Sequence, residues 1–552
     1  MDTRRALEIF GGFLIGAGVT VAGYELAAGG GAESEAKVAN EAGSEAEGGA
    51  GGGAGGGAGG FSFAGVGARE KVSAEERGAG PSEASLAQAA DDQRAAEDAN
   101  AGTATGPYAA DENGHYTSFT RVFYEPVEFT DEHQAQFPKH GLVTAGGLLV
   151  RERADLESRR IGMLRAGARV RVDAQRSFGG GCSSGWHKIF PEGWICVGAG
   201  LEIGETPPDD GSIDVATPDV DEPMPLDYWR VNHDGTPFFH RLPSYSEQDK
   251  ADAAAKAWLA SKGREPMPTD RSKRPDDVPA VVKEYLNAGF YVTIASEHVH
   301  NKRHFLKTNR GVYARKYQLE KKDGSDFQGQ LLSGEDVLPL HFIVRELELM
   351  RRVGDSGLLE GTGEKLPRRS THPFVRKVRI GDYDYYEDAE GKLLRAYAVG
   401  AAEKLKRPPG IGSDEHWIHV DLSEQVLVAY IGDRPVFATL VSTGKEPGMT
   451  PVGVHRIQQK YMVTSMRDQP VEDEAYSIED VPWTQYFSNS VALHGAFWHG
   501  GFGIPRSHGC VNLSPADARW LFGFTEPKLP DGWAGAMPGV MGSEASAVVV
   551  TE

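Results

Sequence analysis

Residues 417–427 read Trp-Ile-His-Val-Asp-Leu-Ser-Glu-Gln-Val-Leu, and this stretch decides the fold of the C-terminal part of the chain. Every second residue over 418–422 is apolar, which is the period of a half-buried strand. Two further apolar runs, 426–430 and 436–441, follow after short polar turns. This pattern predicts an antiparallel meander of strands and a mostly β domain.

Downstream, two short motifs carry a thiol and an imidazole. Leu493-His494-Gly495 precedes Ser507-His508-Gly509-Cys510-Val511-Asn512, and His494 lies 16 residues before Cys510. A cysteine attacks a carbonyl as the thiolate, so we expect a neighbouring base or cation to lower its pKa from about 8.5. His494 cannot meet Cys510 locally, but it can do so from an adjacent strand.

Taken together, an ordered series of motifs resembles the YkuD-type L,D-transpeptidase catalytic domain. The series consists of residues 417–427, 441–444, 450–453, 493–495 and 507–512. We place this domain at 414–526, with a short helix over 515–523 and a C-terminal tail over 527–552. The resemblance implies a β-sandwich fold with Cys510 as the nucleophile and His494 as the base.

The resemblance also implies a substrate class and a reaction. Cys510 would attack the carbonyl between the third and fourth residues of a peptidoglycan stem peptide, and the terminal D-residue would leave. The side-chain amine of a second stem would then resolve the thioester and form a cross-link. Water in place of that amine would make the protein an L,D-carboxypeptidase or a cross-link hydrolase with the same residues. The sequence leaves this choice open, and neither reaction needs a cofactor.

Backbone groups around the pair are expected to orient it and to stabilise the oxyanion. In the family a carbonyl at the position of Gly495 orients the histidine. The N–H groups of Gly509 and Cys510 are expected to form the oxyanion hole, because glycine allows the close approach and the unusual dihedral angles of such a turn.

Four further residues are candidates for substrate binding, namely Ser507, His508, Asn512 and Tyr486. For His508 a structural hydrogen bond is an equal alternative, and for Tyr486 packing in the core is one. Asn512 is expected to order the loop, while His499 is interpreted as a loop residue without a catalytic role.

Two rival interpretations belong to other classes. Zinc could bind His494, His499, His508 and Cys510, but their spacing resembles no common zinc module, so we expect no metal. A non-catalytic cell-wall-binding protein with a degenerate domain is the second rival. The intact Cys510 and His494 argue against it.

Residues 140–204 contain closely spaced short β-type runs between glycine turns, which indicates a small barrel. This segment resembles a bacterial SH3-like domain, a module often found in cell-wall enzymes. Cys182 and Cys196 flank its last hairpin and are expected to form a disulfide, which would leave Cys510 as the free thiol of the three cysteines. Two separate core thiols are the alternative.

Residues 224–405 form an uncertain β-rich region. Residues 249–261 have helical composition, and 290–293 with 307–313 look like the opening and closing hairpins of a second SH3-like unit. The fold class expected for the whole chain is therefore mostly β, with a catalytic β-sandwich and one or two small barrels.

The N-terminal part is expected to target the protein to the cell envelope. Residues 1–28 carry two arginines before an apolar run and are expected to be a signal peptide or an inner-membrane anchor. Residues 29–115 are rich in Gly, Ala and Glu and are expected to be a disordered linker. A net charge of −21 argues against nucleic acid as a partner, and the sequence identifies no protein partner.

Overall fold

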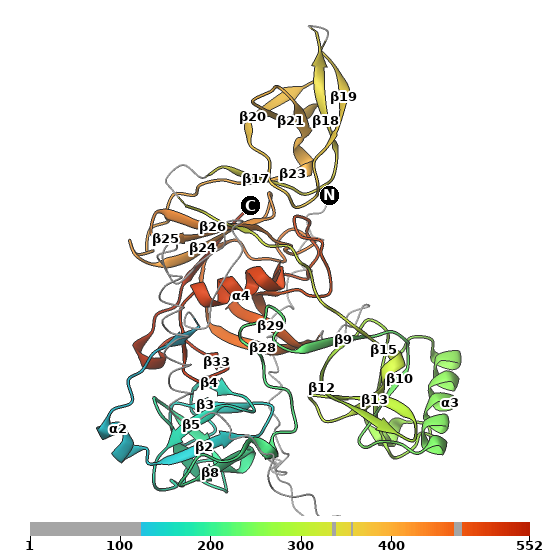
Figure 1. Ribbon diagram of the computed structural model, residues 1–552, viewed down its shortest axis with the longest axis vertical. Helices are drawn as coiled ribbons and strands as arrows, with labels where there is room; N and C mark the ends of the chain where they lie inside the picture. Colours follow the sequence, from blue (N-terminus) through green and yellow to red (C-terminus); the bar gives the residue numbers. More distant parts are fainter. Residues whose placement is uncertain (1–122, 334–337, 355–356, 468–476) are drawn as a thin grey trace, which may run out of the picture. The chain divides into compact units, whose positions relative to one another are not determined.

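The computed structural model describes residues 123–333, 338–354, 357–467 and 477–552. The signal peptide or anchor expected at 1–28 and the linker expected at 29–115 lie outside these residues. Among the residues described, no helix is both long and apolar enough to cross a membrane. The prediction of a mostly β protein is confirmed, since strands make up most of the regular structure (Figure 1).

The C-terminal domain contains the predicted meander as part of a six-stranded sheet. Its strands, in spatial order, are β16 (Gln330–Leu331), β26 (Arg434–Leu440), β25 (Val426–Ile431), β24 (His416–Asp421), β34 (Ala547–Thr551) and β27 (Gly453–Arg456). Strands β24, β25 and β26 pair antiparallel in sequence order, because each is apolar enough to be buried and is closed by a short turn.

The region expected to be a C-terminal tail, 527–552, is instead part of the fold. Strand β34 runs parallel to β24, with Ile418 opposite Val548, and it also pairs with β27. Its residues 547–550 are buried. The boundary at 526 was therefore too early, because this apolar segment fills a position inside the sheet.

A second group of strands carries the histidine motif 493–495 and the end of the cysteine motif 507–512. It consists of β28 (Gln459–Arg467), β29 (Ser477–Ser488), β30 (Val491–Gly495), β31 (Val511–Leu513) and β33 (Gly535–Ala536). Helix α4 (Pro515–Phe524) starts at the cap Ser514, whose hydroxyl accepts the Asp517 N–H.

Helix α4 lies between the two sheets (Figure 1). Trp520 stacks on Phe437 of β26 at 4.2 Å, and Phe522 meets Trp483 of β29 edge-on at 5.5 Å. Both aromatic pairs are fully buried, so the helix fixes the spacing of the sheets that carry the motifs.

Residues 139–204 form a small unit of short strands, as predicted. They are β2 (Lys139–Val143), β3 (Leu148–Arg151), β4 (Arg160–Leu164), β5 (Arg169–Val172), β6 (Trp186–Lys188), β7 (Trp194–Cys196) and β8 (Leu201–Gly204), with the 3₁₀ turn η2 (Val197–Ala199). A short strand β1 (Tyr124–Glu125), which pairs with β32 (Leu529–Pro530), and helix α2 (Asp131–Gln136) precede them. Strand β4 also pairs with β33, so this sheet continues into the C-terminal domain.

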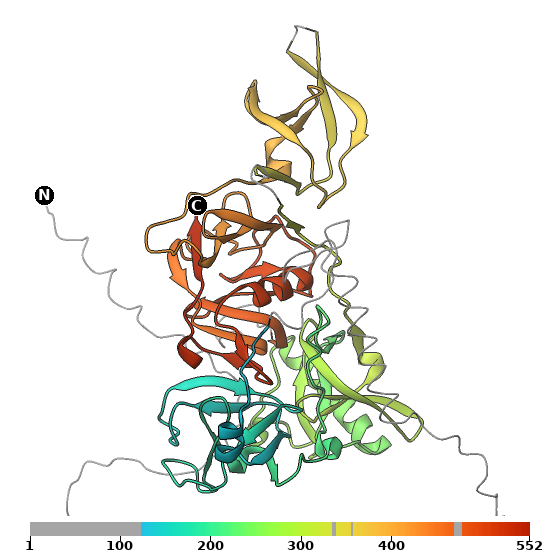
Figure 2. The same cartoon turned by 60° about the vertical axis from the view of Figure 1, so that its left-hand side comes forward.

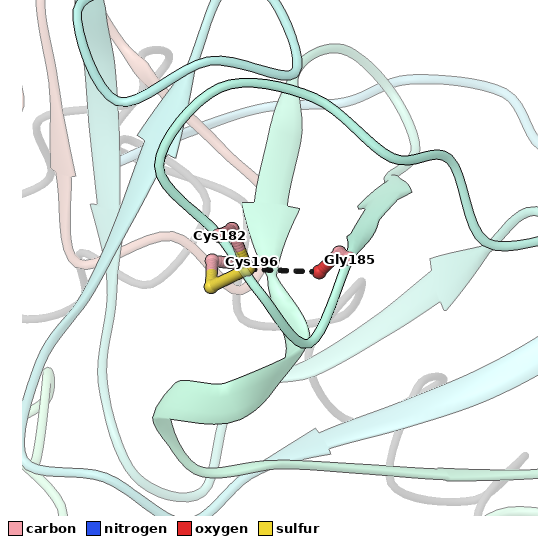
Figure 3. The surroundings of a disulfide bond; sticks show 3 residues. All are labelled: Cys182, Gly185 and Cys196. Carbon is pink, nitrogen blue, oxygen red and sulfur yellow. Dashed lines mark hydrogen bonds between the residues drawn. A yellow bond between two sulfur atoms is a disulfide. The ribbon is translucent and has the colours of Figure 1, made fainter.

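A disulfide joins Cys182 to Cys196 in this first unit (Figure 3). The two Cα atoms lie 5.9 Å apart, and the bond closes a loop of 14 residues next to the hairpin β6–β7. The Cys182 sulfur also lies 3.1 Å from the carbonyl oxygen of Gly185. Cys510 is the free cysteine of the chain.

The uncertain region 224–405 contains two small β units rather than one. The second unit comprises β9 (Asp227–Val231), β10 (Thr236–Phe239), β11 (Val282–Leu286), β12 (Tyr291–His300), β13 (Arg303–Thr308), β14 (Tyr313–Arg315), the 3₁₀ turn η5 (Lys316–Gln318) and β15 (Leu319–Lys321). Helix α3 (Tyr245–Lys262), predicted from its composition, begins with a capping box of Ser244 and Glu247 and packs beside these strands.

The third unit comprises β17 (Leu340–Ile343), β18 (Glu348–Val353), β19 (Leu358–Lys365), β20 (Phe374–Ile380), β21 (Tyr383–Asp388), β22 (Leu393–Arg395), the 3₁₀ turn η6 (Ala396–Ala398) and β23 (Val399–Ala402). Figure 2 shows this unit in yellow, and β19 and β18 lie at one side of its five-stranded sheet. Its own core contains Leu349, Leu394 and Val399.

Candidate active site

Two neighbouring strands bring the histidine motif and the cysteine motif together. Strand β30 runs parallel to β31, with His494 opposite Asn512 and Leu493 opposite Val511. Cys510 directly precedes β31 and therefore lies beside the start of β30. The 16 residues that separate His494 from Cys510 in sequence are thus bridged by strand pairing, as the sequence predicted.

His494 is buried and held in one orientation. It is 2% exposed, and its ring stacks on Trp498 with centroids 5.6 Å apart. Its Nδ1 lies 3.3 Å from the carbonyl oxygen of Gly495, the orienting contact expected at that position. Burial lowers the pKa of His494 to about 4, so the ring is neutral at pH 7. With the proton on Nδ1, Nε2 is left as a proton acceptor.

Cys510 has a pKa shifted in the direction opposite to our expectation. Burial raises the pKa of its thiol to about 11, although a hydrogen bond from the backbone N–H of Ala492 lowers this pKa. Its Sγ lies 3.7 Å from the carbonyl oxygen of Ser490. Since His494 is neutral, it offers no positive charge to stabilise a thiolate. The resting pair is therefore a neutral thiol and a neutral imidazole.

The turn before Cys510 is tied together by Ser507. The Ser507 hydroxyl accepts the Gly509 N–H at 3.0 Å and donates to the carbonyl oxygen of Cys510 at 2.5 Å. Gly509 has φ of +136°, and a Cβ there would lie 2.7 Å from the carbonyl oxygen of Met449. Glycine is therefore required at this position.

These contacts change the roles expected of Gly509 and Ser507. Because the Gly509 N–H already donates to Ser507, it is not a free oxyanion donor in this conformation. No hydrogen bond from the Cys510 N–H is found in the described part of the chain, so this group is the better donor. Ser507 holds the turn instead of presenting its hydroxyl to a substrate.

A neighbouring loop braces the same turn and adds a cation. Thr450, which is 2% exposed, donates to the carbonyl oxygen of Gly509 at 2.7 Å and accepts the Gly444 N–H at 2.9 Å. The exposed Lys445 lies with its Nζ 3.2 Å from Nε2 of His508. Neither Thr450 nor Lys445 was predicted as a site residue, although the threonine belongs to the motif 450–453.

Asn512 is turned towards His499 and away from solvent. It is 4% exposed, and its side-chain amide lies 2.9 Å from Nε2 of His499. The Gly501 N–H donates to Nδ1 of His499 at 3.1 Å, so the ring is held on both sides. Burial, aided by the charge of Arg506, lowers the pKa of His499 to about 4. Asn512 thus orders the loop, as expected, and does not line an open cleft.

The loop between the two motifs, 496–506, is also held by arginines of the third unit. Arg369 donates to the carbonyl oxygen of Gly500 and, at 3.2 Å, to the Ser325 hydroxyl. Arg368 donates to the carbonyl oxygen of Phe502 at 3.4 Å and to that of Val344 at 3.0 Å. Nothing in the local sequence signals these contacts, because they join residues more than 130 positions apart.

Tyr486 lies in the core next to the reactive thiol. It is 3% exposed on β29 and packs against Tyr461. Burial and then the nearby Cys510 raise the pKa of its hydroxyl. Of the two interpretations left open, packing in the core fits its burial, while its proximity to Cys510 places it behind the site.

No group of three or more His, Cys, Asp or Glu side chains in the described ranges is arranged to hold a metal ion. The four residues of the zinc interpretation have other contacts instead. His494 bonds Gly495, His499 bonds Gly501 and Asn512, and His508 contacts Lys445.

Comparison with known proteins places the C-terminal domain in a family. Residues 415–538 match the family model YkuD, described as the L,D-transpeptidase catalytic domain. This part of the chain is a YkuD domain. The match includes β32 and β33, which supports moving the domain boundary beyond 526.

A curated relative of this chain is L,D-transpeptidase 2 of Mycobacterium tuberculosis (strain CDC 1551 / Oshkosh), which is 27% identical over 209 residues. The match covers 33% of this chain and 51% of the relative, so the chain spans about half the length of the curated relative it matches.

Solved structures with a similar part are also named L,D-transpeptidases. One from Stackebrandtia nassauensis is 23% identical over 26% of this chain and 58% of that one, with a TM-score of 0.19. The catalytic domain of the E. faecium L,D-transpeptidase is 23% identical, with a TM-score of 0.20. The match covers 25% of this chain and 98% of that one. An L,D-transpeptidase from Mycobacterium smegmatis is 15% identical, with a TM-score of 0.20. The match covers 47% of this chain and 93% of that one.

Proposed function

We propose that the YkuD domain is a cysteine-dependent acyltransferase that acts on peptidoglycan stem peptides as an L,D-transpeptidase. The observation that carries the proposal is the pairing of β30 with β31. It sets a buried, neutral His494, oriented by the carbonyl of Gly495, next to the strand that follows the free Cys510.

The chemistry follows from the neutral resting pair. As Sγ of Cys510 attacks the carbonyl carbon between the third and fourth stem residues, its proton passes to Nε2 of His494. The Cys510 N–H donates to the developing oxyanion. His494 then gives the proton to the departing amine of the terminal residue, and a thioester remains. The amine of a second stem attacks this thioester, loses a proton to His494 and restores the thiol.

Two alternatives share these residues or this fold. Water in place of the second amine would make the protein an L,D-carboxypeptidase or a cross-link hydrolase. A non-catalytic wall-binding protein would need none of the proton transfers. The constrained turn at Gly509 and the oriented His494 favour catalysis, since a binding role requires neither.

We also place the protein in the cell envelope, because its proposed substrate lies outside the cytoplasm. The disulfide between Cys182 and Cys196 supports an oxidising compartment. Residues 1–28 would serve as a signal peptide or anchor, and 29–115 as the linker between it and the folded part.

The test is covalent labelling of the full chain. A carbapenem, a β-lactam class that acylates this family, should add one adduct by intact-protein mass. Cys510→Ser should give none, because the nucleophile is gone. His494→Ala should slow acylation by about 10²–10⁴-fold, the scale of a positioned acid–base group.

The matched control is His304→Ala, which removes an exposed histidine of β13 and should acylate normally. An adduct that persists in Cys510→Ser would refute the nucleophile. Incubation with tetrapeptide muropeptides then separates the reactions by product mass. A cross-linked dimer indicates transfer, and a tripeptide alone indicates hydrolysis.

A further inference from the structure

The second and third units repeat one pattern at an offset of 80 residues. Residues 303–319 and 383–399 each contain a strand, a turn at a glycine, a three-residue strand, a 3₁₀ turn and the start of another strand. The turn glycines correspond, with φ of +74° at Gly311 and +78° at Gly391. The two units therefore share a local fold, although few of their residues are identical.

Apart from the glycine, two residues are nevertheless identical in this alignment, a half-buried arginine and an exposed tyrosine. Arg315 corresponds to Arg395, and Tyr317 corresponds to Tyr397. The two tyrosines are 58% and 60% exposed. At the buried positions only apolar character is kept, as for Ala314 and Leu394. Packing explains the apolar positions and the turn explains the glycines, but neither requires an arginine and a tyrosine at the surface.

The two arginines also have the same surroundings. In the second unit, Arg315 is the register partner of Phe305, and its guanidinium carbon lies 5.4 Å from that ring and 4.9 Å from Tyr317. In the third unit, Arg395 is the register partner of Tyr385. Its guanidinium carbon lies 5.2 Å from that ring and 6.0 Å from Tyr397.

Tyr383 adds a third ring at 3.5 Å from the guanidinium carbon of Arg395. Both guanidinium groups are thus held between aromatic rings by cation–π contacts.

These guanidinium groups keep unused hydrogen-bond donors. In the described residues, the Arg395 side chain has neither a hydrogen bond nor an ion pair, and its Nη1 is buried without a partner. Arg315 donates to Gln248 at 2.9 Å, but its Nε is buried without a partner. The remaining guanidinium nitrogens, Nη2 of Arg315 and Nε with Nη2 of Arg395, are neither bonded nor buried in the described residues and are suited to donate to a carboxylate.

The first unit provides an internal contrast. It also ends with a strand, a 3₁₀ turn and a strand, after a glycine with φ of +99° at Gly193. The last residue of its strand β7 is Cys196, at the place of Arg315 and Arg395, and it is held in the disulfide. The arginine and the tyrosine are therefore not needed to build this local fold.

We propose that Arg315 with Tyr317 and Arg395 with Tyr397 form two equivalent binding sites, the arginine–tyrosine sites, for the free carboxylates of peptidoglycan stem peptides. The choice of ligand rests on the proposed function of the YkuD domain. Two like sites in one chain suit a polymer that repeats its carboxylates, since binding at one site raises the local concentration at the other. A net charge of −21 gives no general attraction for such a polymer, so recognition must be local.

The test is binding of the full chain to purified peptidoglycan sacculi, measured by co-sedimentation. The Cys510→Ser background prevents turnover. We expect Tyr397→Ala and Arg395→Gln each to weaken binding about tenfold, and Tyr317→Ala combined with Tyr397→Ala to weaken it about a hundredfold or more, because avidity is lost. Phe178→Ala, at an 80% exposed aromatic residue of the first unit, and Val375→Ala, at a 63% exposed residue of β20, are matched controls that should bind normally.

Two modified ligands test the chemistry. Sacculi whose carboxylates have been converted to amides should bind weakly, and so should glycan strands stripped of stem peptides. Unchanged binding to either ligand, or unchanged binding of the double tyrosine variant, would overturn the proposal.

Carbapenem acylation of the same variants with Cys510 intact distinguishes a failure of this proposal from a failure of the proposed acyltransferase function. Acylation at the wild-type rate shows that a variant is folded, and its absence in the wild type would refute the acyltransferase function without altering the sacculus result.

Discussion

The second and third units end in the same way but join the YkuD domain differently. Strand β12 of the second unit pairs with β29, at Tyr291 and Ile478, so one sheet continues from one into the other. Within the described ranges, no strand from β17 to β23 pairs with a strand of the YkuD domain. The third unit makes contact through side chains: Phe342 and Ala402 share a hydrophobic core with β24–β26, and Arg368 and Arg369 reach the loop 496–506.

This difference between the two junctions predicts which unit contributes to the stability of the fold and which one influences the acylation rate. The second junction combines the backbone pairing of Tyr291 and Ile478 with buried side-chain contacts, such as the hydrogen bond from the Tyr228 hydroxyl to the carbonyl oxygen of Asp480 at 2.8 Å. Contacts from two arginines depend on those side chains alone, and they act on the loop that connects His494 to Cys510. We therefore expect changes at the second junction to affect unfolding, and changes at the third to affect the acylation rate.

The largest effect is expected at Asp480, where the second unit and the first unit meet β29. This residue is 8% exposed, accepts the Thr293 hydroxyl at 2.5 Å and pairs with Arg165 at 3.2 Å. Asp480→Asn fits the positive φ of +51° but leaves Arg165 without its counter-charge. We expect a loss of about 3 kcal/mol in the free energy of unfolding, measured in urea, with little change in the acylation rate. A variant with unchanged stability and slow acylation would contradict the assignment of this junction to stability.

A smaller, pH-dependent effect is expected from the neighbouring Glu479. Burial raises the pKa of this carboxyl to about 7, despite its ion pair with Arg310 at 2.9 Å. The folded state therefore holds a proton that the unfolded state releases near pH 4.5, so this group's contribution to stability is lost as the pH rises from about 4.5 to 7.

Glu479→Gln should abolish that loss, on the order of 2 kcal/mol in the difference between the two stability–pH curves. His494 has a lowered pKa and gives the opposite slope in the same range, but it is present in both proteins and cancels in the difference. Parallel curves for the two proteins would contradict the assignment.

The smallest effect is expected at the third junction, and it is kinetic. Arg369→Ala removes the donor to Gly500 and should slow carbapenem acylation about tenfold, because the loop 496–506 carries His499 and begins next to His494. Arg369→Lys keeps a cationic donor and should recover most of the rate. Arg351→Ala breaks only an exposed ion pair on β18 and is the matched control. A normal rate in Arg369→Ala would show that the third unit does not act through this contact.

Local patterns made the centre of the site predictable from sequence. The alternation over 418–422, the cap at Ser514 and the motifs around His494 and Cys510 are encoded within a few residues, and the structure contains the corresponding strands, helix and neighbouring motif positions. The two cysteines that flank one hairpin are local in the same sense.

Features that depend on distant partners were missed. The segment 547–551 finds its place beside β24, more than a hundred residues away, and therefore looked like a tail. Arg368 and Arg369 reach the loop 496–506 only in the folded chain. The raised pKa of Cys510 depends on how deeply the thiol is packed, which no motif reports.

The neutral resting pair has a consequence for how Cys510 reacts with oxidants. Peroxides and disulfides react with thiolates far faster than with thiols. With a pKa of about 11, Cys510 remains protonated at neutral pH and is a poor target for oxidation or for exchange with the Cys182–Cys196 bond. In the proposed mechanism the thiol is activated only when a carbonyl binds and His494 takes the proton. Protonation at rest therefore slows the oxidation of this free cysteine.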